Sequence, residues 1–340
     1  MSRINPKDSI YLRGRKCLEI PPLFDKLLSK YPEVIYETAK SNIFSSVSCE
    51  YILQCYSRTV FPSCAPPECV TIDLHYIDLL CMMMAWYRTE ENSYLDEVFC
   101  ALAENNYLNQ SEPDYEDAAF IRWIRSKTTL NPFTSEDLNG ALLINLIAIM
   151  HESSHAITDF QEFDIIYAEH APDLGIDPTK DEIRREVKSD FFALTNILTA
   201  NTKQLLGKDP EEILDLYYIM QMLNCMFQIL PSTVSKPADM KKLFESSRDR
   251  LLMTLHMMRG TGLQPNLNWD KILARQPSEK ILRGYRYIAD TFLDRITPYQ
   301  TEYTQLPQAD IEATITALKE EEARKRQNSF AYIYPDPAET

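Results

Sequence analysis

Two histidines and a glutamate lie close together near the middle of the chain, in the run His151-Glu152-Ser153-Ser154-His155. Residues four apart share one face of an α-helix, so both imidazole rings can reach a single point. Neutral imidazole nitrogens are good ligands for Zn²⁺, and two of them supply half of a tetrahedral shell. Glu152 is placed to take a proton from a water molecule on the metal rather than to bind the ion itself.

The residues around this motif favour a buried helix, because from Ala141 to Thr158 almost every flanking residue is apolar or uncharged. The alternative is a buried amphipathic helix that carries two incidental histidines. Two histidines and a glutamate would be costly to bury among leucine and isoleucine without a partner. We therefore expect a metal site with His151 and His155 as ligands and Glu152 as the general base.

The helix that carries the motif should begin near Ser135 and run to about Phe160. Thr134 and Ser135 are N-cap candidates, and Glu136 and Asp137 put acid in the first turn, where the helix dipole favours it.

A second helix is predicted over residues 180–198. Thr179 and Glu182 form a capping box before a buried stripe that repeats every three or four residues, at Ile183, Val187, Phe191, Leu194 and Leu198. Glu186 and Asp190 lie four apart on the neighbouring flank. Thirty residues separate His155 from Glu186, which is enough for a loop and a return helix that packs against the first.

This combination resembles the gluzincin group of zinc metallopeptidases, in which His-Glu-x-x-His is followed by Glu-x-x-x-Asp on a second helix. Glu186-Val-Lys-Ser-Asp190-Phe-Phe-Ala is similar to the Glu-x-x-Ala-Asp segment of HtpX-like and related peptidases. The resemblance spans residues 135–201. It implies that Glu186 is the third zinc ligand and that Asp190 orients a ligand histidine by accepting its free ring N–H. The alternatives are an exposed acidic flank at these positions, and His170 as the third ligand.

Overall length and motif placement also resemble the phage-exclusion peptidases that cut elongation factor Tu. Those carry a downstream His-Pro-Ser followed by Arg, and Ser246-Ser-Arg-Asp-Arg-Leu251 is similar to that segment without the His-Pro. Zinc peptidases of this type add a donor that stabilises the oxyanion. We rank His256 first, because a histidine on an apolar helix needs a polar partner. The further candidates are Arg250, Tyr217 and Tyr218.

Composition narrows the function classes. The 340 residues carry a formal net charge of −15, which disfavours nucleic acid and anionic membranes as partners. Only seven glycines are present, and no Gly-rich phosphate loop is found. The longest apolar runs, Leu79–Trp86 and Ala141–Met150, are too short to span a bilayer.

No secretory signal peptide is visible at the N-terminus, so the eight cysteines are expected to be reduced thiols. We expect a cytoplasmic protein. A glutamate-rich patch near the C-terminus also resembles the export signals of some bacterial effectors, which leaves delivery into another cell as an alternative.

The predicted fold is α+β, predominantly α-helical and zincin-like, with the active-site helix packed under a small sheet that includes Val70–Tyr76. Residues 1–305 should form the metallopeptidase domain, with a helical part and the sheet over 1–133 and the metal-site helices over 134–305. Pro298–Pro307 is expected to be a loop. Residues 306–340 should form a charged C-terminal helix and tail.

The predicted function is a zinc-dependent endopeptidase that acts on protein or peptide substrates. Zn²⁺ bound by His151, His155 and Glu186 would leave a fourth position open for water, and Glu152 would take the proton of that water. One alternative is a binding or scaffold protein that keeps the metal for stability alone. Another is a zinc hydrolase of a non-peptide bond. The substrate and the oligomeric state are not predicted.

Overall fold

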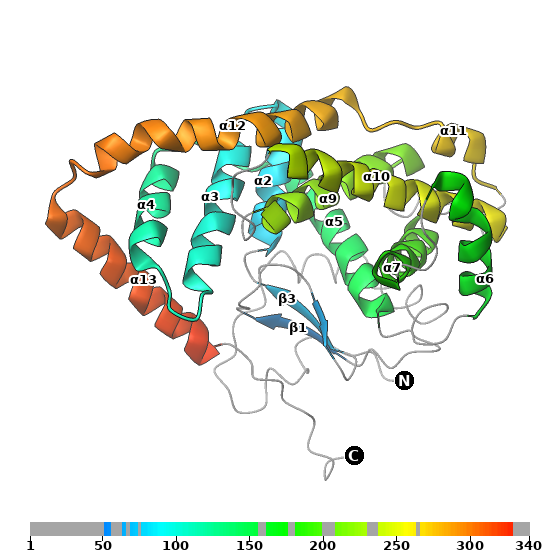
Figure 1. Cartoon of the computed structure of the whole chain (residues 1–340), viewed down its shortest axis with the longest axis horizontal. Coiled ribbons are helices and arrows are strands. Elements are labelled where there is room, and N and C mark those ends of the chain that lie inside the picture. The colour runs from blue at the N-terminus through cyan, green and yellow to red at the C-terminus, as the bar shows by residue number, and fades with distance from the viewer. Residues whose placement is uncertain are drawn as a thin grey trace, which may run out of the picture.

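The computed structural model describes residues 51–55, 63–65, 69–73, 76–155, 161–175, 181–198, 208–229, 237–262 and 266–328. Its described part is a body of packed helices with a small group of strands beside it (Figure 1). The apolar spacing over Pro21–Tyr31 also predicts a helix, and this stretch lies outside these residues.

The strands come first in the chain: β1 (Tyr51–Cys55), β2 (Ser63–Ala65) and β3 (Cys69–Asp73). Their order is β1-β3-β2, with β1 parallel and β2 antiparallel to β3. The strand predicted at Val70–Tyr76 coincides with β3 only as far as Asp73, because Tyr76 already begins a helix.

The first three helices of the body are α2 (Tyr76–Thr89), α3 (Ser93–Leu108) and α4 (Tyr115–Ser126). The apolar run Leu79–Trp86, which predicts a core helix, lies within α2, where Leu80 and Met83 are fully buried. The apolar spacing of the sequence predicts amphipathic helices over Ser93–Leu108 and Tyr115–Ser126, and both bounds are confirmed. Asp114 caps α4 by accepting a hydrogen bond from the backbone N–H of Asp117.

The metal-site helices follow, together with the shorter helices that lie between or after them. They are α5 (Ser135–Ser154), α6 (Gln161–His170), the 3₁₀-helix η4 (Pro172–Leu174), α7 (Asp181–Ile197), α9 (Pro210–Ile229), α10 (Pro237–Gly260) and α11 (Trp269–Leu273).

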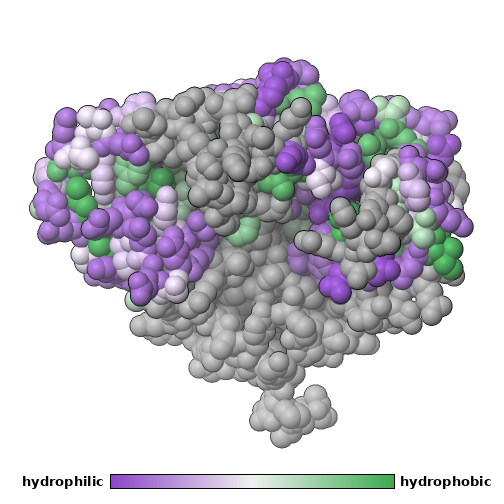
Figure 2. Space-filling model, in the orientation of Figure 1, coloured by the Kyte–Doolittle hydropathy of each residue, from purple (hydrophilic) through white to green (hydrophobic). Residues whose placement is uncertain are grey.

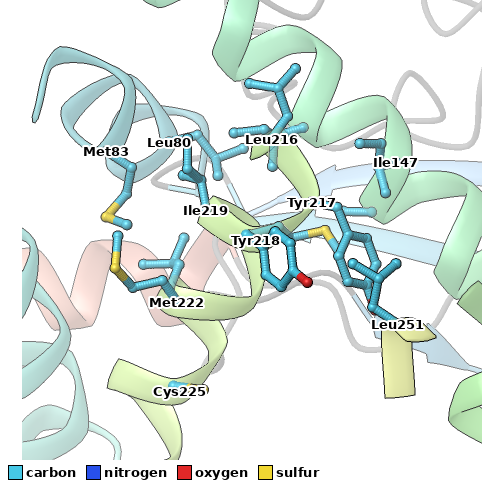
Figure 3. Close-up of a cluster of buried hydrophobic side chains, with 14 of the residues drawn as sticks. Leu80, Met83, Ile147, Leu216, Tyr217, Tyr218, Ile219, Met222, Cys225 and Leu251 are labelled. Atoms are coloured by element: carbon cyan, nitrogen blue, oxygen red, sulfur yellow. The ribbon is translucent and has the colours of Figure 1, made fainter. Parts of the chain in front are cut away.

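The hydrophobic core is organised around α9. Figure 3 shows side chains of this helix between those of α2, α5 and α10, with Tyr217, Ile219 and Met222 fully buried. Leu80 of α2 and Leu251 of α10 belong to the same cluster. A helix that is apolar all round is stable only in the middle of a bundle, and this is where α9 lies.

The predicted α+β zincin-like class was wrong, although the helical character was right. Among the described residues, α5 packs chiefly against α2 and α7 and next against α9, and its contacts with β3 and β2 are more limited. The core side chains whose burial is described lie on helices and on the short turns that adjoin them. Helix-on-helix packing therefore positions the metal-site residues.

The loop predicted at Pro298–Pro307 was also wrong for most of its length. Helix α12 runs over Glu279–Tyr303 with Pro298 inside it, along one edge of the body (Figure 1). Proline removes one backbone donor and usually kinks or ends a helix. Here Tyr299 and Tyr303 pack on Trp123 at ring-centroid distances of 6.0 and 5.5 Å, and this tertiary packing holds the last turns in place.

The charged C-terminal helix, α13 (Gln308–Asn328), packs against α4. Leu318 is fully buried in a small cluster there, and Arg122 of α4 donates to Glu321 over 2.7 Å. Tyr115 also donates to the buried Glu322. This helix is therefore anchored to the body along one side.

The described surface is mainly hydrophilic on the face drawn in Figure 2, with scattered apolar spots. Within the part of the chain that the structure describes, none of the helices has the length and apolar character needed to cross a membrane. The three cysteines with described side chains, Cys81, Cys100 and Cys225, are free and buried.

Candidate metal centre

Helix α5 has a fixed start and ends beside the second histidine. Thr134 is the N-cap, and it forms a capping box with Asp137, so the predicted start is confirmed. The helix ends at Ser154, and His155 follows with helical backbone angles of φ −61° and ψ −23°. The rings of His151 and His155 therefore stay on one face, with centroids 4.9 Å apart. Residues 156–160, where the helix was predicted to continue, lie outside the described part.

Helix α7 brings the acidic pair to this face of α5. The predicted stripe is confirmed: Val187, Phe191, Leu194 and Leu198 are buried, and Ile183 packs partly buried beside them. This buried stripe turns the flank that carries Glu186 and Asp190 towards α5. The predicted capping residue Thr179 lies outside the described residues.

The three predicted ligands converge on one point. Nε2 of His151 lies 3.2 Å from Nε2 of His155 and 3.3 Å from Oε2 of Glu186. Nε2 of His155 lies 3.7 Å from Oε1 of Glu186. Ligand atoms bound at about 2.0–2.1 Å to a tetrahedral zinc are about 3.3 Å apart, so the triangle has the size that one such ion requires. These three residues could hold a metal ion.

The other ring nitrogen of each histidine has its own partner. Nδ1 of His151 lies 2.8 Å from Oδ1 of Asp190, and Nδ1 of His155 lies 3.1 Å from Oγ of Ser189. When each Nδ1 carries its proton and donates it to that oxygen, Nε2 keeps a free lone pair for a metal. Asp190 thus contacts a histidine of the motif, as the resemblance implies.

Asp190 is itself held by two further groups. Its side chain is fully buried, and its Oδ2 accepts a hydrogen bond of 2.5 Å from the hydroxyl of Tyr217 on α9. Nε of Arg250 on α10 lies 2.6 Å from the same oxygen. Arg250 also donates from Nη1 to Oε2 of Glu186 over 2.9 Å. One guanidinium therefore bridges Glu186 and Asp190 and fixes the positions of both carboxylates.

The pKa values of the site residues reflect this crowding of charged groups. Burial lowers the pKa of His151, but the carboxylates of Asp190, Glu186 and Glu152 outweigh it and raise the pKa to about 10. Burial and the charge of His151 lower the pKa of His155 to about 4. Burial raises the pKa of Glu186, but contact with His151 and the charge of Arg250 outweigh it and lower the pKa to about 2.

A cavity of about 310 Å³ opens onto the ligands, and Glu152 lines it with them. Tyr76, the first residue of α2, lines it too. Burial raises the pKa of the Tyr76 hydroxyl, and the charge of Glu152 raises it further, so the hydroxyl remains a donor at neutral pH. The remaining walls come from α5, α9 and α10: Ala148, Met220, Gln221, Asn224, Cys225, Phe227, Leu243, Ser246, Ser247 and Arg250.

Of the residues predicted to stabilise the oxyanion, only Arg250 is among the described lining residues of this cavity. Arg250 lines it, whereas His256 is not among its described lining residues. Burial lowers the pKa of His256, and the nearby charges of His170 and Arg259 lower it further, which places His256 beside α6. His170 lies against Gly260 at the end of α10 and does not join the group of three ligands among the described residues. Tyr217 donates to Asp190 instead.

The residues around the histidines were predicted less completely than the ligands. Ser189 and Tyr76 were not singled out, and Arg250 was considered only as an oxyanion donor. A signal for Ser189 exists, because it precedes Asp190 and lies three residues after Glu186 on the same helix. Nothing local in the sequence points to Tyr76 or to the double contact of Arg250.

No family model, curated protein or solved structure matches this chain. Inference about its activity therefore depends on the site geometry and on the sequence motif.

Proposed function

We propose that this protein is a zinc-dependent endopeptidase whose ligand set is of the gluzincin type. The observation that carries the proposal is the convergence of His151, His155 and Glu186 within 3.2–3.7 Å of one another, at the wall of a cavity that Glu152 also lines. Two histidines and one glutamate are a donor set that catalytic zinc sites use, with a fourth position left open for water.

Each residue has a task in the proposed reaction. A zinc ion held by His151, His155 and Glu186 would supply Lewis acidity and would make a water molecule acidic enough to lose a proton near neutral pH. Glu152 accepts a proton from the attacking water and returns it to the leaving amine. Asp190 and Ser189 hold the two imidazoles in the orientation that directs Nε2 towards the ion. The hydroxyl of Tyr76 donates to the oxygen that becomes negative.

A purely structural metal site is the alternative from another class. Structural zinc sites are usually closed by four ligands and rich in cysteine. Here the group found among the described residues has three members and no cysteine, and it faces a cavity with a carboxylate beside it. These features favour catalysis over a role in stability alone.

Two neighbouring chemistries share this donor set. Non-haem iron(II) oxygenases also use two histidines and one carboxylate, and zinc hydrolases cut bonds other than peptides. Glu152, one residue after His151, favours hydrolysis because it provides the base that water attack needs.

The experiment that tests the proposal combines metal analysis with cleavage of a denatured protein mixture. The purified protein should contain one zinc ion per chain by mass spectrometry. New N-termini, mapped in the mixture, should appear with the wild type and disappear after chelation. Adding zinc back should restore them.

The matched control is Glu152→Gln, which should keep its zinc and lose the cleavage. Zinc retention with no new N-termini from the wild type would favour the scaffold alternative or a non-peptide substrate. Stoichiometric iron would contradict the zinc assignment. Cleavage by Glu152→Gln at the wild-type rate would show that another group is the base.

A further inference from the structure

Gln221 is a buried amide without a hydrogen-bond partner for its Nε2 atom among the described residues. It lies in the middle of α9, is 2% exposed, and stands between the buried Met220 and Met222. Buried side-chain amides are nearly always paired, because leaving one unpaired costs stability. An apolar side chain would suit this helix better, so the amide needs a reason other than packing.

The position of Gln221 supplies that reason. Gln221 lines the same cavity as His151 and Glu186. A molecule bound at the metal ligands would therefore enter the space that Gln221 borders. Unsatisfied polar groups that border a ligand cavity are commonly satisfied by the ligand.

The rest of the cavity wall indicates what kind of group would occupy it. Asn224 lies three residues further along α9, on the same face as Gln221, and also lines the cavity. Apolar surface beside them comes from Met220, Phe227 and Leu243. Apart from the residues of the proposed metal centre, the described lining contains one charged side chain, Arg250, and it is already paired with Glu186 and Asp190. Such a wall suits an uncharged segment that carries a carbonyl oxygen next to an apolar side chain.

We propose that Gln221 is a substrate-binding residue whose Nε2 donates a hydrogen bond to a main-chain carbonyl of a peptide bound at the metal centre. This inference rests on the proposed peptidase function and specifies how the substrate is held. The preferred substrate is an extended peptide segment with an uncharged, apolar side chain beside the bond to be cut. Nε2 of Gln221, which has no partner among the described residues, gains one when the peptide binds.

Two probes separate this contact from metal binding. Acetohydroxamate binds a metal ion through its hydroxamate group and has no further carbonyl that Gln221 could contact. An N-acetylated dipeptide hydroxamate with leucine side chains binds the ion in the same way and adds main-chain carbonyls. The difference between their affinities measures what the cavity wall contributes.

The variant is Gln221→Met, which keeps the length of the side chain and removes its donor. We expect the zinc content and acetohydroxamate affinity to be unchanged. The dipeptide hydroxamate should bind about 10-fold more weakly, the loss expected for one hydrogen bond to a buried group. The melting temperature should stay the same or rise, because an unpaired buried amide is removed. Gln300→Met, an exposed position on α12, is the matched control and should change neither affinity.

Other outcomes overturn the inference. If the wild type and Gln221→Met bind the dipeptide hydroxamate with equal affinity, Gln221 has no role in substrate binding. If Gln221→Met binds both hydroxamates more weakly by the same factor, Gln221 acts through the metal site. If the melting temperature of Gln221→Met falls by several degrees, its amide has a partner inside the protein. If the wild type binds no acetohydroxamate in a chelator-sensitive way, the proposed function fails, and this inference fails with it.

Discussion

Asp190 and His151 come from different helices and meet inside the protein, with Oδ1 of the carboxylate 2.8 Å from Nδ1 of the imidazole. Asp190→Asn keeps the shape of the side chain and removes its charge. We expect zinc affinity to fall about 10- to 100-fold, the usual effect of losing a partner of a ligand histidine. Competition with a chromogenic chelator measures this change.

Ser189→Ala is the matched control for that variant. Ser189 contacts Nδ1 of His155 over 3.1 Å through a neutral hydroxyl. A neutral hydrogen bond is about half as strong as one to a carboxylate, so the loss of zinc affinity should be smaller. Equal losses in the two variants would contradict the view that the charge of Asp190 is what matters.

Glu186→Ala should lose the metal altogether, because it removes one of the three ligands. Added zinc should raise the melting temperature of the wild type, since the ion binds only the folded state. It should leave that of Glu186→Ala unchanged. His170→Ala is the control and should bind zinc normally, because His170 lies beside Gly260 and outside the ligand group. If Glu186→Ala binds zinc and His170→Ala does not, then His170 is the third ligand and Glu186 is not.

The part of the site that lies within one helical turn could be predicted from the sequence. His151 and His155 are four residues apart, and helix geometry alone brings them together. Glu186 and Asp190 required a further inference, that a capped amphipathic helix returns to pack on the first. Arg250 and Tyr217 lie on α10 and α9, and their contacts with Asp190 arise only from the packing of those helices.

The errors in the fold have the same origin. The β-branched run after Val70 predicted a strand, and β3 is present, but sequence alternation carries no information about which elements cover α5. Pro298 predicted a loop because proline lacks a backbone donor. The contacts of Tyr299 and Tyr303 with Trp123 on α4 override that local preference, and α4 is distant in the sequence.

Tyr76→Phe should reduce kcat about 10²- to 10³-fold, the usual effect of removing an oxyanion donor, while zinc content stays normal. Tyr76 lines the cavity, and its hydroxyl is protonated at neutral pH. His256→Ala should leave turnover unchanged, because His256 is not among the described lining residues. Steady-state kinetics on a peptide identified from the cleavage map would decide between them. If His256→Ala loses turnover and keeps its zinc, His256 is the oxyanion donor, as the sequence predicted.

Asp137 should make the stability of the fold dependent on pH in the acid range. It caps α5 by accepting from the backbone N–H of Thr134 over 2.7 Å, and it accepts two hydrogen bonds from Arg88 of α2, over 2.8 and 2.9 Å. Burial raises the pKa of Asp137, but these bonds outweigh it and lower the pKa below its ordinary value.

A carboxylate with a lowered pKa contributes stability above the unfolded-state pKa of about 3.9, and this contribution disappears as the pH falls through the folded-state value. Asp137→Asn should therefore lower the free energy of unfolding by about 1–3 kcal/mol at pH 7, through the lost cap and ion pair. Urea unfolding followed by circular dichroism should show the difference from wild type persisting to about pH 5 and shrinking below about pH 4. The exposed neighbour Glu136 is the control, and Glu136→Gln should change stability by about 0.5 kcal/mol or less. A difference for Asp137→Asn that stays constant from pH 7 to pH 3 would mean that its charge contributes nothing to stability.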